Sequence, residues 1–215
     1  MKVNAYNILK KWLVWYSICP FLLVTSCYPE FKNPLPHPEK TESDREIIGN
    51  WSRLSETGGK EFVCVFPRKS GWIDIIYIYE IESDVSMDGP NVLVYEGFTS
   101  IVKDNKFLCL RFRKKDFPGI EGKHKDFPYL FVDYQIEHDG KLIARMFSSE
   151  KIKRLIQEKK LAGKIIISNS EGLHLFEEMI IDCPSNELVR AISDEGIQAF
   201  LSDKIEDKLI FTRNK

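Results

Sequence analysis

From residue 45 onward, apolar and polar residues alternate in short segments separated by turn residues. In residues 73–81 every second position is Ile or Tyr, while Asp74 and Glu80 fall on the other face. The same period of two recurs over residues 130–136. Successive side chains of a strand point to opposite faces, so this pattern predicts strands that are buried on one face only.

Residue pairs that tolerate a positive φ angle separate these segments, as at Gly58-Gly59 and Asp139-Gly140. Connections this short make strands that follow one another in sequence pair antiparallel. Strands are predicted at residues 47–55, 60–67, 72–82, 91–102, 106–113, 129–137, 141–148, 164–168, 173–181 and 208–212.

Two helices interrupt the strands. The first follows Ser149, a residue type that caps helices, and ends before Gly163. Its apolar face is made by Ile152, Leu155 and Ile156. The second is predicted to begin at Ser193 or Asp194. Its buried residues would be Ile197, Phe200 and Leu201.

An open sheet of this many strands has edges that act as templates for aggregation, so closure into a barrel is expected. The predicted fold is therefore mainly β: an antiparallel meander of about 8–10 strands closing into a barrel, with two short helices. It forms a single β-rich domain over residues 45–215. The alternative fold is a β-sandwich of two sheets.

Three positions resemble the lipocalin family. Gly49-Asn50-Trp51 opens the first predicted strand and resembles the Gly-X-Trp motif, whose tryptophan plugs the closed end of an eight-stranded barrel. Arg213 ends the last predicted strand, as does the arginine that covers this tryptophan in the family. The resemblance implies a lipocalin-like barrel with structural roles for Gly49, Trp51 and Arg213.

Asp133-Tyr134 is similar to the later Thr-Asp-Tyr motif of lipocalins, although Val132 replaces the threonine. The helix predicted at 151–162 also departs from the family, because it falls between strands where a standard lipocalin has none. The resemblance therefore covers isolated points of the chain.

Residues 1–26 resemble a bacterial lipoprotein signal peptide. Three lysines precede an apolar run, Trp12 to Val24, that is shorter than the ~20 residues a bilayer-spanning helix needs. The run ends in Val24-Thr25-Ser26-Cys27, which resembles the lipoprotein processing site and implies that Cys27 is lipidated. Cys19 does not match, because Tyr16 and Ile18 are too bulky for the preceding positions.

The residue after Cys27 is Tyr28, not the Asp that retains many lipoproteins at the inner membrane. The resemblance thus implies a lipid-anchored protein of the bacterial cell envelope, at the outer membrane and facing the periplasm. Residues 27–44 contain four prolines, which favour extended polyproline II, and are predicted to be a tether between lipid and domain.

The chain has 31 basic and 32 acidic residues. Removing the signal peptide takes away three lysines and leaves 28 basic against 32 acidic residues, a net charge of −4. Nucleic acid is therefore not expected as a partner. Adhesion to anionic lipid by charge alone is not favoured either, so the lipid on Cys27 is the expected link to the membrane.

The chain lacks hydrolase, phosphate-loop and dinucleotide motifs. None of its histidines has a partner at the spacing of helical zinc sites; they are His37, His124, His138 and His174. We therefore expect no metal, no cofactor and a noncatalytic role.

Three cysteines remain beside Cys19 and Cys27: Cys64, Cys109 and Cys183. In an oxidising compartment they allow one disulfide and one buried thiol. Cys64 alternates with Phe62 and Phe66, which favours packing as a small hydrophobic residue.

Two segments are candidates for binding. Residues 114–127 form a long connection rich in charge, and the predicted helix at 151–161 carries five basic residues. Two functions stay open: binding of a small apolar ligand inside the barrel, or a protein-interaction or structural role with a filled barrel.

Overall fold

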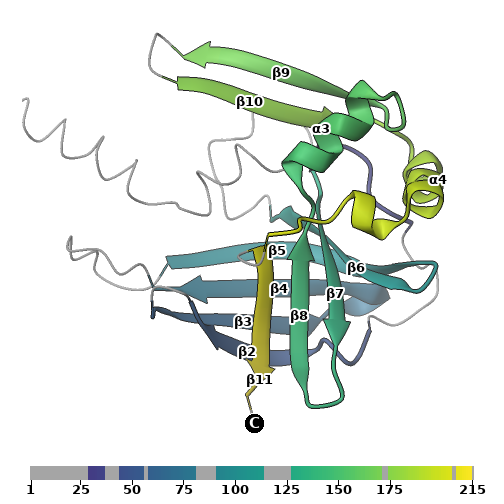
Figure 1. Ribbon diagram of the computed structural model, residues 1–215. Coiled ribbons are helices and arrows are strands. Elements are labelled where there is room, and N and C mark those ends of the chain that lie inside the picture. The colour runs from purple at the N-terminus through teal and green to yellow at the C-terminus, as the bar shows by residue number, and fades with distance from the viewer. Residues whose placement is uncertain are drawn as a thin grey trace, which may run out of the picture.

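The computed structural model describes residues 29–36, 44–55, 58–80, 91–113, 127–170, 174–204 and 207–214. Within these ranges, eight antiparallel strands form a closed barrel with a second layer beside it (Figure 1). The predicted lipocalin-like barrel is therefore confirmed in place of the β-sandwich. In ring order the strands are β11 (Lys208–Arg213), β2 (Gly49–Leu54), β3 (Lys60–Pro67), β4 (Trp72–Tyr79), β5 (Asn91–Val102), β6 (Asn105–Phe112), β7 (Leu130–Ile136) and β8 (Lys141–Met146).

The period of two sorts the side chains between the interior and the outer wall of the barrel. On β4, Ile75 and Tyr77 are buried in the interior, whereas Asp74 lies on the outer wall. All eight strands contribute to one interior core in the same way. The pairing of β2 with β3 shows which strand termini lie at each end of the barrel. At one end Gly49 pairs with Val65, and at the other end β2 leads into the turn to β3.

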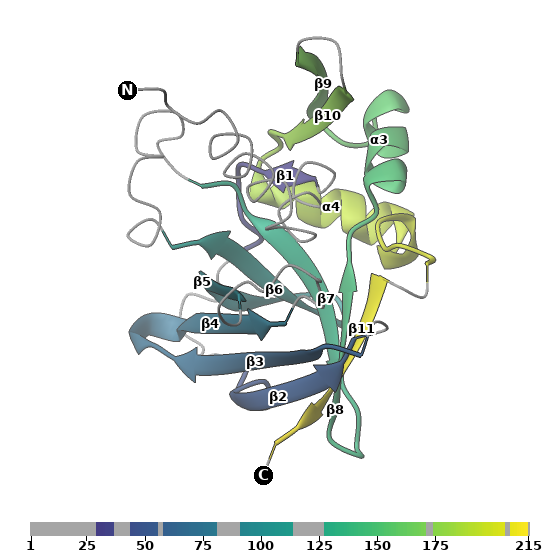
Figure 2. The same cartoon turned by 90° about the vertical axis from the view of Figure 1, so that its left-hand side faces the viewer.

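A side layer is inserted between β8 and β11. It contains α3 (Ser149–Gln157), β9 (Gly163–Ser170), β10 (His174–Ile181), α4 (Ser185–Glu195) and the 3-10 turn η3 (Ile197–Ala199). The layer lies along one wall of the barrel (Figure 2). It packs there through a second core, which joins Phe98, Phe107 and Phe131 of the barrel to Ile152 of α3 and Leu188 of α4.

Each predicted strand corresponds to an observed one, with ends that differ by a few residues. The second helix was predicted in the wrong place. Instead of starting at Ser193 or Asp194, α4 begins at Ser185 and stops before Gly196, whose φ of 77° breaks the helix. The predicted buried residues Phe200 and Leu201 are buried, but they follow the short turn η3.

The expected tether is corrected over residues 29–36. These residues pack onto the domain, with Phe31 and Leu35 fully buried. Strand β1 (Glu30–Phe31), which was not predicted, pairs in parallel with β10. A two-residue strand leaves no periodic signal in the sequence, and the neighbouring prolines favoured the prediction of an extended tether instead. Residues 27–28 and 37–43 of the predicted tether lie outside the described residues.

Candidate functional site

One end of the barrel is closed by the segment just before β2. The Trp51 ring is fully buried, and its Nε1 donates a hydrogen bond to the Ile47 carbonyl at 2.8 Å. Arg213 lies opposite Trp51 in the β11–β2 register, and its guanidinium carbon is 4.5 Å from the centre of the indole. It also donates a hydrogen bond to the Glu46 carbonyl. The contact expected between Arg213 and Trp51 is thus present.

Asp44 holds this closing segment to strands on the far side of the barrel. Its carboxylate accepts hydrogen bonds from Lys106 of β6 at 2.8 Å and from Tyr134 of β7 at 2.9 Å. Burial opposes ionisation, but the hydrogen bonds from Lys106, the Glu46 amide and Tyr134 outweigh it and hold the pKa of Asp44 below its ordinary value. Because β2 and β6 face each other across the ring, the segment crosses the barrel end.

The Asp133-Tyr134 pair therefore points in two directions. Tyr134 faces the barrel interior and binds Asp44, whereas Asp133 lies on the outer wall and pairs with Arg145 at 2.7 Å. Burial raises the pKa of Asp133, and Arg145 offsets this only in part. Both residues thus have structural partners.

The barrel interior holds a charged group that the sequence analysis missed. Arg53 of β2 makes two hydrogen bonds to Glu61 of β3, at 2.7 and 2.8 Å. The Tyr77 hydroxyl donates to the same carboxylate at 2.6 Å, and burial raises the pKa of this phenol. Glu61 is only 7% exposed. The alternation in each strand could have placed Arg53 in the inward phase of Trp51 and Glu61 in the inward phase of Val65, but their pairing depends on the register between β2 and β3.

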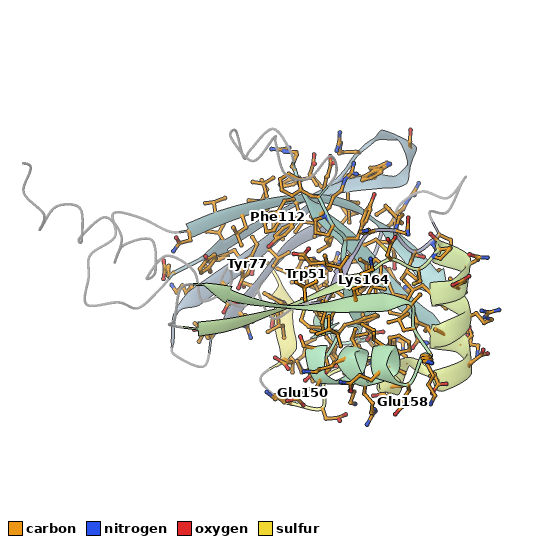
Figure 3. The ribbon with its side chains drawn as sticks, turned by 90° about the horizontal axis from the view of Figure 1, so that it is seen from above. Trp51, Tyr77, Phe112, Glu150, Glu158 and Lys164 are labelled. Atoms are coloured by element: carbon orange, nitrogen blue, oxygen red, sulfur yellow. The ribbon has the colours of Figure 1, made fainter. Side chains whose placement is uncertain are left out.

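Aromatic rings surround this group toward the end of the barrel that lies away from Trp51. Tyr77 stacks on Tyr79 with ring centres 5.2 Å apart, and Tyr95 stacks on Phe112 at 4.7 Å (Tyr77 and Phe112 are labelled in Figure 3). The Arg53 guanidinium also lies 5.4 Å from the Phe211 ring. This part of the interior is therefore both apolar and charged.

A second charged group lies on the outer wall. Arg111 of β6 contacts Glu96 at 2.8 Å, and its guanidinium carbon is 5.2 Å from the ring centre of Trp72 and 5.5 Å from that of Tyr129. Arg68 contacts Glu96 at 3.1 Å. A hollow of about 680 Å³ opens here; it is lined by Pro67, Arg68, Ser70, Trp72, Glu96 and Arg111.

The basic segment at 151–161, a candidate for contact with phosphate groups or with a protein, corresponds to α3 and the residues just after it, and two of its lysines have partners within the chain. Lys151 reaches the Asp203 carboxylate at 2.7 Å, and Lys160, just after α3, contacts Glu195 at 2.9 Å. A hollow of about 550 Å³ between the end of α3 and α4 has charges of both signs, including Arg190 and Glu187. Neither feature selects an anion.

The three cysteines of the domain form no disulfide. Cys109 and Cys183 are buried, and burial raises the pKa of both thiols, that of Cys183 to about 11. Cys64 lies half-buried on the outer wall of β3. Buried thiols with a raised pKa stay protonated and react poorly.

The remaining candidates lie partly outside the described residues, among them His37, His124, Cys27 and the connection 114–126. In the part of the chain that the structure describes, no three potential metal ligands come together. Within the same ranges, no helix is long and apolar enough to span a bilayer. No family model matches this chain, and comparisons with curated proteins and with solved structures give no match.

Proposed function

We propose that this protein is a noncatalytic binding lipoprotein of the bacterial cell envelope, anchored through lipidated Cys27, with the outer membrane as its site. The sequence Val24-Thr25-Ser26-Cys27 after a short apolar run supports the anchor, and Tyr28 supports the outer membrane. The ligand is a small, largely apolar molecule with a polar group, held in the barrel interior.

The ion pair between Arg53 and Glu61 carries the ligand proposal. Two charges taken out of water contribute little net stability to a fold, and apolar residues of similar size often stabilise it as well or better. An ion pair inside an apolar barrel is therefore better explained by recognition. Tyr77, Tyr79 and Phe112 supply apolar surface beside it.

Replacing the cysteine tests the anchor. Cys27→Ser should leave an unprocessed precursor that no longer incorporates labelled fatty acid, whereas Cys19→Ser should be processed and labelled normally. Continued labelling of the Cys27→Ser protein would exclude Cys27 as the modified residue.

Native mass spectrometry of the protein purified from its own membranes tests the ligand. The wild type should retain a small molecule. The double variant Arg53→Met, Glu61→Leu should fold, because both charges are removed together, but should lose that molecule. Lys60→Met, at an exposed position of β3, is the matched control and should keep it.

A filled barrel with a protein-interaction or structural role is the second candidate. It is favoured by the large side chains that already occupy the interior, including Trp51, Tyr95, Tyr134 and Phe211. In that case the spectra should show no small molecule in wild type or variant, and a protein should copurify instead.

A further inference from the structure

The first described residues are fixed to the domain by hydrogen bonds on both sides of β1. Phe31 and Tyr129 exchange two backbone hydrogen bonds, at 3.1 and 2.7 Å, and the Lys32 amide donates to the Ile181 carbonyl at 3.0 Å. Further on, Ser185 donates to the Pro34 carbonyl. Pro29 itself is buried. The segment after Cys27 is thus part of the fold from residue 29 onward.

Covalent geometry then limits how far the lipid can lie from the domain. Only Tyr28 separates Cys27 from Pro29. Two residues span at most about 7 Å, so the acyl chains must leave the protein next to β1. A domain held this closely has one face against the bilayer, and that face includes the surroundings of β1.

From β1, a chain of contacts leads across the outer side of the barrel. Tyr129 bridges to Phe31, and its hydroxyl accepts a hydrogen bond from Arg111 at 3.3 Å. Arg111 pairs with Glu96 of β5, which lies opposite Asp74 of β4. These outward side chains lead from the anchored segment directly to the outer wall of β3, β4 and β5.

That wall is apolar where a soluble barrel would be polar. Two ladder rows cross it, Phe62–Ile78–Val92 and Cys64–Ile76–Val94, with Phe66 beside them. We call these seven residues the β3–β5 wall. Phe66 and Val92 are 46% and 53% exposed. None of the seven belongs to either core of the described residues.

The charges beside the β3–β5 wall fit a phospholipid surface. Arg68, Arg111 and Arg113 stand at its border with Asp74 and Glu96, which leaves a local excess of one positive charge although the mature chain carries −4. Apolar side chains reach into the acyl boundary while guanidinium groups stay at the phosphates.

We propose that the β3–β5 wall docks on the bilayer to which Cys27 is anchored, so that the domain lies flat on the membrane with its arginine border at the headgroups. The proposal rests on the lipid anchor of the proposed function. Because the anchor keeps the wall at a high effective concentration near the bilayer, a contact too weak to recruit an unanchored protein is sufficient.

Cys64 is a native reporter, because it lies in the wall while Cys109 and Cys183 are buried. The mature lipidated protein is reconstituted into vesicles of phosphatidylethanolamine and phosphatidylglycerol, and labelling of Cys64 by a water-soluble maleimide is followed by peptide mass. Labelling should be several-fold slower in vesicles than in detergent. His138→Cys, at an exposed turn outside the wall, should place a thiol that labels equally in both.

Single substitutions in the wall and a control outside it then test whether docking on the bilayer is what protects Cys64. Phe66→Glu or Val92→Glu should restore rapid labelling of Cys64 in vesicles. Ile210→Glu is the matched control, because Ile210 is 45% exposed on β11 outside the wall, and it should leave the protection unchanged.

Three results overturn the proposal in distinguishable ways. If the protein carries its lipid but Cys64 labels equally fast in vesicles and detergent, the anchor stands and the docking is wrong. If Cys64 is protected in native membranes but not in pure lipid vesicles, a protein covers the wall instead of lipid. If mass analysis finds no lipid on Cys27, the docking and the proposed anchor fall together.

Discussion

The indole of Trp51 is held by two different interactions, a hydrogen bond to the chain before β2 and the Arg213 guanidinium over its face. Trp51→Ala should lower the free energy of unfolding by about 3–5 kcal/mol through lost packing. Arg213→Lys should cost less, because cation–π contacts contribute ~0.5–2 kcal/mol and a lysine keeps the charge but loses the planar stacking.

Urea unfolding of the purified variants measures both effects. Lys208→Arg, an exposed position on the same strand, is the control and should be close to wild type. Equal stability of Arg213→Lys and Lys208→Arg would mean that the arginine merely lies near the ring.

Asp44 gives the closed barrel end a dependence on pH. Its pKa is lower in the folded protein than in the unfolded chain, so its contribution is complete above about pH 4 and is lost as the pH falls below that value. Asp44→Asn should therefore reduce stability by about 1–3 kcal/mol at neutral pH and by much less in acid, once the carboxylate of the folded protein is protonated.

The comparison must be made between variant and wild type at each pH, because Asp133 has a raised pKa and contributes with the opposite sign. Asp104→Asn, at an exposed turn, serves as the control. A loss of stability in Asp44→Asn that is the same at acid and neutral pH would show that the ionised carboxylate is not what matters.

At the scale of single elements, the inward face of β4 gives the clearest prediction of which side chains stabilise the barrel. Ile75→Ala and Tyr77→Ala should each cost about 2–5 kcal/mol, because both side chains are buried in the barrel core. Glu80→Ala, just after the strand and exposed, should cost under about 0.5 kcal/mol. Thermal and urea unfolding provide the measurement, and three equal small losses would refute the assignment of the inward face.

The strands could be predicted because alternation is a local property that burial on one face imposes on every strand. The second helix was misplaced because Ile197, Phe200 and Leu201 imitate a helical stripe, while Leu188 and Ile192 of the true α4 have the same spacing. The partners of Arg53 and Arg111 lie on neighbouring strands, so they depend on register, which no single segment of sequence contains.

At the scale of the whole molecule, barrel and side layer share a core and should unfold together. Phe147 lies in that core, with its ring centre 5.6–6.1 Å from those of Phe31, Phe107, Phe131 and Phe200. Phe147→Ala should lower the stability of both layers by about 3–5 kcal/mol.

Trp51 and Trp72, the tryptophans among the described residues, lie on barrel strands, whereas α3 and α4 lie in the side layer. Tryptophan fluorescence and helical circular dichroism should therefore report a single coincident transition, in wild type and in Phe147→Ala. Two separate transitions would show that the side layer is an independent unit.

The strand that completes the ring is also the last of the eight to be synthesised. Until β11 arrives, β2 has an unpaired edge, and about 60 residues between β8 and β11 must be looped out before the ring can close. Such long-range pairing is slow, and an open strand edge is where nascent chains associate with one another. The hazard for this molecule during its maturation is thus a seven-stranded intermediate, whose lifetime is set by how fast the inserted layer condenses and delivers β11 to β2.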